Sequence, residues 1–223
     1  MSTGRIYAGE SAADRDARRR RQLLDAALHI FGERGYAQAT VRGICREAHV
    51  ADRNFYEYFP TTEDLLIAVY DECCDRLETA ATEAVLAARE GEHPGAVPVA
   101  RAGLDAFLTV VRENPALGRV VWQEVLGVSP RVDATYQERE ERFAAMLLAL
   151  APVLEDAKVA APPAQRRLED ADLRHRLVAL TGVGGVNQVV LRWVVGGFSE
   201  PQETIVGVLV DHLTGTAAIL ART

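Results

Sequence analysis

The sequence predicts an all-α fold, with a three-helix N-terminal head that contains a helix–turn–helix, then a C-terminal helical bundle, about nine helices in total. Three observations lead to this prediction. Apolar residues recur at spacings of three and four along most of the 223-residue chain, which is the period of an amphipathic helix. Ser, Thr, Asn, Gly and Pro stand where helices would begin and end. No stretch alternates apolar and polar residues between hairpin turns, as strands would.

The head is predicted over residues 16–62. It follows an expected disordered tail at residues 1–15, which is polar and shows no period. The first helix covers about residues 16–34, where leucines and alanines form an apolar stripe. We expect it to end at Gly35, because glycine adopts the left-handed conformation of a helix C-terminus at least cost.

Two short helices joined by a tight turn complete the head. Thr40 is placed to cap the first, which runs to about Ala48, with its hydroxyl accepting a backbone N–H. His49 interrupts the apolar period and marks the turn. The second helix covers about residues 52–58 and stops before Pro60, because the residue that precedes proline is pushed out of helical geometry. Its outward side chains are rich in hydrogen-bonding groups, which is typical of a helix that enters a nucleic-acid groove.

The C-terminal bundle is predicted over residues 63–223. Its first helix begins where Thr61 and Asp64 have the spacing of a capping box, and it runs to about residue 88. Ser199 and Gln202 have the same spacing before the last helix. Loops are expected at residues 91–98 and 158–164, which contain Gly or Pro. The remaining helices are expected at about residues 98–113, 115–126, 130–156, 166–195 and 202–220.

Charge is unevenly distributed along the chain. The net charge is −7, yet residues 1–62 contain ten Arg and only eight Asp or Glu. The head therefore carries +2, which leaves −9 for the remainder. A mildly basic head on an acidic body suits a protein in which only the head meets phosphate.

Cysteine content and hydropathy indicate the compartment. The three cysteines, which include the adjacent pair Cys73 and Cys74, do not form a disulfide framework. A reducing cytoplasm is therefore expected. The longest run without a charged residue, residues 177–191, is 15 residues long, and a bilayer-spanning helix needs about 20. We accordingly expect a cytoplasmic protein with no membrane partner.

Residues 20–70 resemble the DNA-binding head of the TetR family of transcriptional regulators. The resemblance rests on an amphipathic helix ending in G-Y, then T-V-R-x-I-x-R-E-A-x-V-A, then F-Y-x-Y-F-P-x-x-E-x-L-L. The matching positions are Gly35, Thr40, Val41, Ile44, Ala48, Val50, Tyr56, Phe59, Glu63 and Leu66.

The resemblance implies a homodimer that reads a palindromic operator in double-stranded DNA. The helix–turn–helix would enter the major groove, and residues 63–223 would form an effector-binding and dimerisation domain. A small-molecule effector, whose identity the sequence does not give, would change the separation of the two heads and release the operator. We expect such a protein to be a repressor, with activation left open by the sequence, and we expect no enzymatic activity, cofactor or metal.

Three residues depart from the family pattern. His49 stands where the turn usually carries glycine, and histidine is among the residues that tolerate positive φ. Thr62 replaces a lysine that commonly contacts phosphate. Asp52 suits the N-terminal end of the helix dipole but repels phosphate. DNA affinity is therefore expected to depend more on Arg42, Arg53 and the arginines at 18–21.

Seven residues are predicted to contact DNA. Arg42 and Arg53 can donate two parallel bonds to guanine, although a solvated surface arginine is the simpler interpretation of each. Tyr56 matches a family position that hydrogen-bonds phosphate, and Thr40 can both cap its helix and touch phosphate. The full set is Thr40, Arg42, Arg53, Asn54, Tyr56, Tyr58 and Thr62.

Two further groups are predicted in the bundle. Aromatic residues can line an apolar effector pocket with polar neighbours, or simply fill the core; the candidates are Phe107, Arg119, Trp122, Gln123, Tyr136 and Phe143. Glycines within a helix cost about 1 kcal/mol each relative to alanine, which close approach at a dimer interface or a tight monomer core would compensate. The interface candidates are Gly182, Gly185, Val186, Val190, Trp193, Ile205, Leu209 and Leu213.

Two alternative functions remain open at this stage. An all-helical enzyme is disfavoured because the five histidines are scattered and no Cys or carboxylate cluster has metal-ligand spacing. An interaction module that kept the helix–turn–helix but lost strong DNA binding would be consistent with His49, Asp52 and Thr62.

Overall fold

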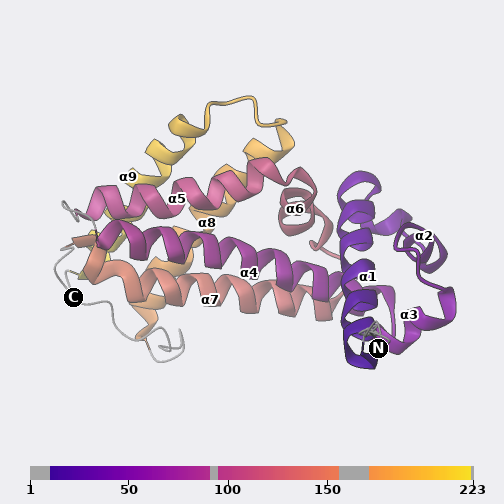
Figure 1. The fold of residues 1–223 in the computed structure, drawn as a ribbon. Helices are drawn as coiled ribbons and strands as arrows, with labels where there is room; N and C mark the ends of the chain where they lie inside the picture. The colour runs from indigo at the N-terminus through magenta and orange to yellow at the C-terminus, as the bar shows by residue number, and fades with distance from the viewer. Residues whose placement is uncertain (1–10, 91–94, 156–170, 222–223) are drawn as a thin grey trace, which may run out of the picture. The chain divides into compact units, whose positions relative to one another are not determined.

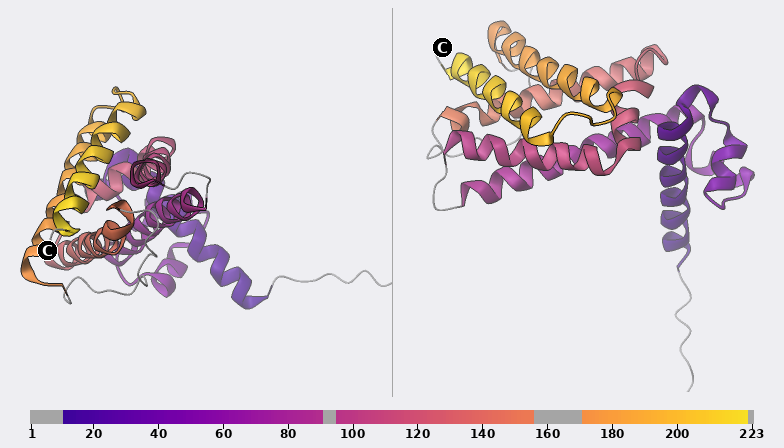
Figure 2. Two further views of the ribbon diagram at one scale, coloured as in Figure 1. Left: turned by 90° about the vertical axis from the view of Figure 1, so that its left-hand side faces the viewer. Right: turned by 90° about the horizontal axis from the view of Figure 1, so that it is seen from above.

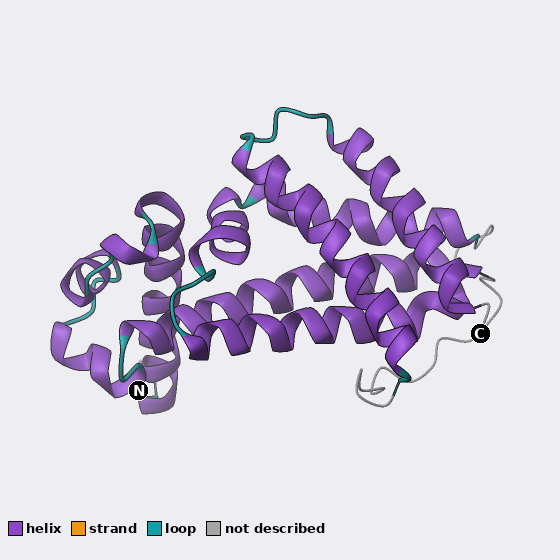
Figure 3. Ribbon diagram, turned by 180° about the vertical axis from the view of Figure 1, so that it is seen from behind, coloured by secondary structure: helices purple, strands orange, loops and turns teal. Residues whose placement is uncertain are grey.

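The structure, a computed structural model, describes residues 11–90, 95–155 and 171–221. Within these ranges all regular elements are helical (Figures 1 and 3), which confirms the predicted all-α fold. Two compact units are present, Met1–Val69 and Tyr70–Thr223. The elements are α1 (Ala12–Arg34), η1 (Tyr36–Gln38), α2 (Val41–Glu47), α3 (Asp52–Tyr58), α4 (Thr62–Arg89), α5 (Ala96–Glu113), α6 (Pro115–Arg119), η2 (Val120–Glu124), α7 (Pro130–Glu155), α8 (Leu173–Val195) and α9 (Gln202–Ala221).

The first helix begins earlier than the sequence pattern indicated. Ser11 caps α1, since its hydroxyl accepts from the Asp14 backbone N–H at 3.1 Å, and the Asp14 carboxylate accepts from the Ser11 N–H at 3.2 Å. This reciprocal pair is a capping box, and it extends the helix into a segment assigned to the tail. Residues 1–10 of that predicted tail lie outside the described residues.

The N-terminal unit is built on a small apolar core. Phe31 of α1, Ile44 of α2 and Phe55 of α3 are fully buried, and α2 contacts both α1 and α3. Thr40 caps α2 as predicted, with its Oγ1 accepting from the Gly43 N–H at 3.1 Å. His49 adopts φ 54°, so the turn keeps its left-handed geometry without glycine.

In the C-terminal unit, α7 contacts α8 and α9, α5 contacts α9, and α8 and α9 lie side by side (Figure 2). Ion pairs join α4 to α7. Arg139 of α7 contacts Asp71 at 2.8 Å and Asp75 at 2.6 Å, and Arg142 contacts Glu78 at 2.8 Å. These pairs connect the middle of α4 to α7, which runs beside it (Figure 1).

Two further helix boundaries and one cap differ from the prediction. Asn114 and Pro115 open α6 as expected, but it gives way after five residues to the π-helical turn η2. Asp172 caps α8, accepting from the His175 N–H at 3.0 Å, so the helix starts later than residue 166. The capping box expected at Ser199 does not form.

Gln202 is instead a link between α9 and α5. Its amide Nε2 donates to Asp105 Oδ1 at 2.8 Å and to Thr109 Oγ1 at 2.9 Å. The side chain therefore bonds to a neighbouring helix rather than to the N-terminus of its own. Residues 91–94 and 156–170, which include the second predicted loop, lie outside the described residues.

Candidate nucleic-acid interface and ligand cavity

Helix α3 has one face in the core and one face in solvent. Phe55 and Phe59 are buried on the inner face, while Arg53, Tyr56 and Glu57 are exposed. Tyr56 is 61% exposed although its ring packs edge-on against Phe55, with centroids 5.3 Å apart. The Phe55 contact fixes the Tyr56 ring and leaves the side chain exposed, so its hydroxyl can contact a phosphate.

The predicted contacts on α2 share this exposure. Arg42 is exposed. Thr40 is exposed too, and its cap bond to Gly43 uses the hydroxyl as an acceptor, so the hydroxyl proton is not consumed by capping. Both predicted roles of Thr40 are geometrically compatible.

Other predicted DNA contacts are less open. Tyr58 is half-buried, and its hydroxyl donates to Asp16 Oδ1 of α1 at 3.0 Å. This bond engages the Tyr58 hydroxyl within the head in the absence of DNA, so its contact with DNA stays a prediction. Asn54 and Thr62 are half-buried, and Thr62 is the first residue of α4, directly after its capping residue Thr61, whose Oγ1 accepts from the Asp64 N–H at 3.0 Å.

The arginine run near the start of the head is partly engaged within the chain. Arg21 pairs with Asp25 at 2.7 Å, and Arg19 lies 3.7 Å from Asp16. The Arg20 guanidinium stacks 5.4 Å above the centre of the Phe59 ring, a cation–π arrangement. These contacts tie the run to acidic residues of its own helix and to Phe59, the residue that follows α3.

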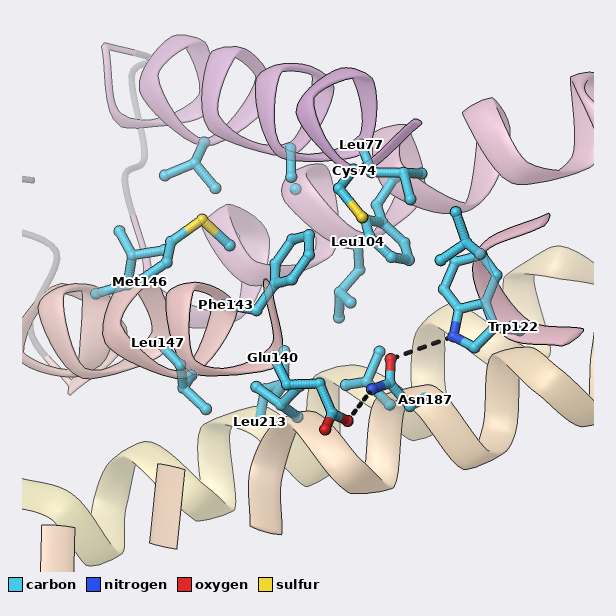
Figure 4. Close-up of a pocket in the computed structure, with 18 of the residues that line it drawn as sticks. Cys74, Leu77, Leu104, Trp122, Glu140, Phe143, Met146, Leu147, Asn187 and Leu213 are labelled. Carbon is cyan, nitrogen blue, oxygen red and sulfur yellow. Dashed lines mark hydrogen bonds between the residues drawn. The ribbon is translucent and has the colours of Figure 1, made fainter. Parts of the chain in front are cut away.

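The C-terminal unit encloses an apolar cavity of about 130 Å³. Four predicted pocket residues meet in its wall: Phe107, Trp122, Tyr136 and Phe143. Phe107 makes edge-on contacts with both Trp122, at 6.1 Å between centroids, and Phe143, at 6.5 Å. Aliphatic side chains from α4, α5, α7, α8 and α9 complete the wall (Figure 4).

Two predicted pocket residues are absent from that wall. Arg119 lies 3.8 Å from Glu124 in an ion pair, and Gln123 does not line the cavity either. The prediction assumed a regular helix here. The π-helical turn η2 inserts an extra residue per turn, which changes the direction of successive side chains and leaves Trp122 on the cavity side.

The polar lining of the cavity was not foreseen. The Trp122 indole Nε1–H donates to Asn187 Oδ1 at 3.2 Å, and Asn187 Nδ2 donates to Glu140 Oε1 at 2.9 Å (Figure 4). The Tyr136 hydroxyl donates to the same Glu140 oxygen at 3.1 Å. An indole N–H can only donate, so it fixes which end of the Asn187 amide points at Glu140.

Burial controls the protonation of three groups near this cluster. It is the main reason that the pKa of the Cys74 thiol is raised to about 12. Burial, and then the negative charge of Glu140, raises the pKa of Tyr136. Burial and contact with Cys74 raise the pKa of Tyr70, whose ring lies 6.2 Å from that of Tyr136. All three groups therefore remain protonated at neutral pH.

The predicted dimer residues mostly pack within one chain. Val190, Trp193 and Leu209 are at most 1% exposed, so another subunit cannot reach them. Gly182 and Gly185 lie against side chains of α7 and α9, and Val186 and Leu213 line the cavity. Both glycines thus permit close packing of helices within one chain, and of this set Gly185 and Ile205 are neither buried nor part of the cavity wall.

A different face of the same two helices is exposed. Leu173 and Leu177 of α8 are 65% and 55% exposed, and Val208 and Ile219 of α9 are 54% and 43% exposed. On the same face of each helix, at spacings of three or four residues, most of the other exposed positions are glycines or polar residues. By length and composition α8 and α9 could each cross a membrane, with mean hydropathies of 1.4 and 1.3, but helices of soluble cores meet the same criterion. We call Leu173, Leu177, Gly184, Val208, Gly215 and Ile219 the outer stripe.

Among the described residues, no group of three or more His, Cys, Asp or Glu could hold a metal ion. Cys73 and Cys74 are buried.

The comparisons with known proteins agree with this arrangement. Residues 23–69 match the family model "Bacterial regulatory proteins, tetR family". A Fatty acid metabolism regulator protein of Bacillus subtilis (strain 168) is 43% identical over 51 residues, which cover 23% of this chain and 26% of that protein. The matched segment thus spans about a quarter of the curated relative.

Solved structures resemble the chain over most of its length. The fatty acid degradation regulator FadR from Bacillus halodurans has a TM-score of 0.70 and 22% identity, with 88% of this chain and 95% of that chain covered. The transcriptional regulator FadR from Bacillus subtilis, in complex with stearoyl-CoA, has a TM-score of 0.68 and 20% identity, with 88% and 98% covered. At these identities the likeness establishes the fold. The match of residues 23–69 to the family model identifies a head of the tetR type, and the chain as a whole has the fold of these solved regulators.

Proposed function

We propose that this protein is a homodimeric, sequence-specific DNA-binding repressor that a small molecule releases from a palindromic operator. The observation that carries the proposal is the helix–turn–helix, in which α2 and α3 expose Arg42, Arg53 and Tyr56 on a rigid apolar core. Arginine and tyrosine side chains at the ends of short helices are typical groups for contacts to base edges and phosphates. The relatives named above are regulators, which supports this reading over an enzyme. A regulator of this kind would act in the cytoplasm.

The outer stripe supports the dimer. It presents apolar side chains from two adjacent helices, and exposed apolar stretches of this kind mark interaction sites. A second copy that applies the same stripe would form a four-helix contact with twofold symmetry. The exposed glycines Gly184 and Gly215 have open space around them within one chain, which would let a partner helix approach closely.

The cavity supports the effector. Its wall is dominated by aliphatic and aromatic side chains, and one structural relative is in complex with stearoyl-CoA. We therefore infer an effector whose larger part is apolar. The described cavity is smaller than the roughly 300–1,000 Å³ of typical ligand sites, so the walls must move when such a ligand enters.

Helix α4 is the element through which the ligand would act on the heads. It is continuous from Thr62 to Arg89, and Leu77, Ala81 and Val85 contribute to the cavity wall. Expansion of the cavity would displace this part of α4 relative to α7, against the ion pairs of Arg139 and Arg142 that join the two helices. A shift of α4 would change the separation of two heads in a dimer.

Gel-shift titration against the DNA that flanks the protein's own gene tests the proposal. We expect salt-sensitive binding to a palindrome whose half-site centres are about 34–36 Å apart, or a multiple of that distance. Arg53→Ala should weaken binding by about 1–3 kcal/mol if it contacts a base. The matched control Arg101→Ala removes an exposed arginine from α5 and should leave affinity unchanged. Absence of specific binding would favour an interaction module without DNA-binding activity.

A further inference from the structure

The cavity wall carries a negative group and no positive one. Its lining residues, all among those the structure describes, include Glu140 but no Lys, Arg or His. An apolar cavity with a single acidic residue disfavours a ligand that brings an anionic group inside, because two like charges in a poorly solvated site repel each other strongly. The wall therefore disfavours an anionic group on the ligand relative to a neutral or positively charged one.

The hydrogen bonds within the wall show which partner is missing. Trp122 donates to the side-chain oxygen of Asn187. Asn187 and Tyr136 both donate a hydrogen bond to Glu140 Oε1. Both of the direct donors use that one oxygen. Among the described residues, none donates a hydrogen bond to the second carboxylate oxygen, Oε2. This oxygen is also not among the fully buried side-chain atoms that lack a hydrogen-bond partner, so it remains accessible.

Most donors in the wall are already committed, and the exception is the second N–H of the Asn187 amide, because only one of its two protons is used by Glu140. The indole of Trp122 and the hydroxyl of Tyr136 each have one proton, and each proton has an acceptor within the cluster. The hydroxyl of Tyr70 is engaged with Cys74. What the cluster offers to a ligand is thus mainly acceptor capacity, concentrated on Glu140.

We propose that the effector carries a hydrogen-bond-donating group, an amine or a hydroxyl, which binds Glu140 Oε2 while the apolar part of the molecule fills the space between Phe107, Phe143 and Met146. This inference rests on the proposed role of the cavity as the effector site and narrows the ligand class. A long acyl chain alone leaves Oε2 without a partner. A carboxylate placed at this end of the cavity faces Glu140 directly.

Three probes of one chain length test the inference: octylamine, octan-1-ol and octanoate, titrated calorimetrically into the purified dimer. Octylamine should bind the wild-type protein about ten- to a hundred-fold more tightly than octanoate, since a hydrogen bond to a charged group is worth this much. The affinity of octan-1-ol relative to octylamine shows whether hydrogen-bond donation or positive charge causes the preference for octylamine. Affinity close to that of octylamine indicates the donor itself, and affinity well below it indicates the positive charge.

Glu140→Gln is the decisive variant. Glutamine keeps the shape and one acceptor oxygen for Tyr136 and Asn187, but it replaces Oε2 with an amide donor. Octylamine affinity should fall by about ten-fold or more, and octanoate affinity should rise. Glu141→Gln removes the same charge from the neighbouring, exposed position on α7 and should reproduce the wild-type preference.

Two outcomes overturn the inference: octylamine fails to bind the wild-type protein, or Glu140→Gln leaves the ratio of octylamine to octanoate affinity unchanged. Operator binding by the ligand-free protein is measured separately and tests the proposed function. A regulator that binds its operator but prefers octanoate would therefore refute the ligand class alone. A protein that binds octylamine through Glu140 but binds no DNA would refute the regulator.

Discussion

Gly185 of α8 lies directly against the imidazole ring of His212 of α9. A Cβ added at Gly185 would come 2.8 Å from His212 Cε1 and closer still to Nε2. The ring cannot easily move aside, because Nε2 lies 3.0 Å from the Gly182 carbonyl oxygen and must donate to it, since a carbonyl only accepts. Glycine is thus required where α8 and α9 cross, inside one chain.

Gly185→Ala should therefore lower the free energy of unfolding by about 1–3 kcal/mol, the usual cost of overpacking, despite the better helix propensity of alanine. Urea unfolding at a fixed protein concentration measures the change. Gly207→Ala is the matched control, because Gly207 lies within α9 with no atom near the added Cβ. It should stabilise the protein by up to about 1 kcal/mol. Equal effects of the two substitutions would contradict the packing described here.

Two tyrosines on α3 should respond differently to loss of their hydroxyl groups. Tyr56→Phe should weaken operator binding by about 0.5–1.5 kcal/mol, the value of a typical hydrogen bond, because its exposed hydroxyl is available to phosphate. Tyr58→Phe should leave operator affinity nearly unchanged, because that hydroxyl bonds to Asp16 within the head. Gel-shift titration of both variants at one salt concentration separates them. A larger loss for Tyr58→Phe would place Tyr58 on the DNA after all.

The head could be predicted from sequence because its determinants are local. The bond from Gly43 to Thr40 spans three residues, and the left-handed turn is set at His49 itself. The commitment of Tyr58 to Asp16 could not be predicted in this way, because the two residues are 42 positions apart. Their contact depends on how α3 packs against α1.

The cavity residues, too, could be predicted from sequence only where the signal is local. Four aromatic residues could be assigned to the cavity because large apolar side chains on several bundle helices converge on a common interior. Asn187 and Glu140, 47 positions apart, meet only through the register of α8 against α7. The failure at Gln123 has a local cause, the π-helical turn, which hydrophobic periodicity does not reveal.

Sequence alone could not separate dimer residues from core residues, because α8 and α9 are apolar on more than one face. Periodicity identifies apolar faces but does not indicate which face packs within the chain and which meets a partner. The fully buried Trp193 and the 54% exposed Val208 are both apolar residues at helical spacing. Only the packing of α7 and α5 against this helix pair decides between them.

Val208→Glu should convert the dimer to a monomer. It places a charge in the centre of the proposed contact, and the twofold axis brings two copies of the charge together. Leu126→Glu is the control, because Leu126 is similarly exposed, at 48%, but lies outside α8 and α9. Light scattering after size exclusion at micromolar concentration should show a monomer for Val208→Glu and a dimer for Leu126→Glu. A dimeric Val208→Glu variant would exclude the outer stripe as the interface.

Stability should decline at alkaline pH because of the protonated groups beside the cavity. Cys74 has an ordinary pKa of 9.0, which the fold raises to about 12, and the pKa values of Tyr70 and Tyr136 are also raised. The unfolded chain therefore releases these protons at lower pH than the folded chain does. The stabilisation is complete below about pH 9 and is lost as pH rises towards 12, and Cys74 alone contributes a slope of about 1.4 kcal/mol per pH unit.

Urea unfolding at several pH values between 8 and 11 measures this slope. In Cys74→Ala, the decline between pH 9 and 11 should be shallower than in the wild-type protein. The comparison uses the slope rather than the absolute stability, because removing the buried sulfur also leaves a small void that lowers stability at every pH. An unfolding free energy that stays constant or rises from pH 9 to 11 would show that Cys74 is not held in its neutral form by burial. Identical slopes for the two proteins would assign the alkaline loss to the tyrosines.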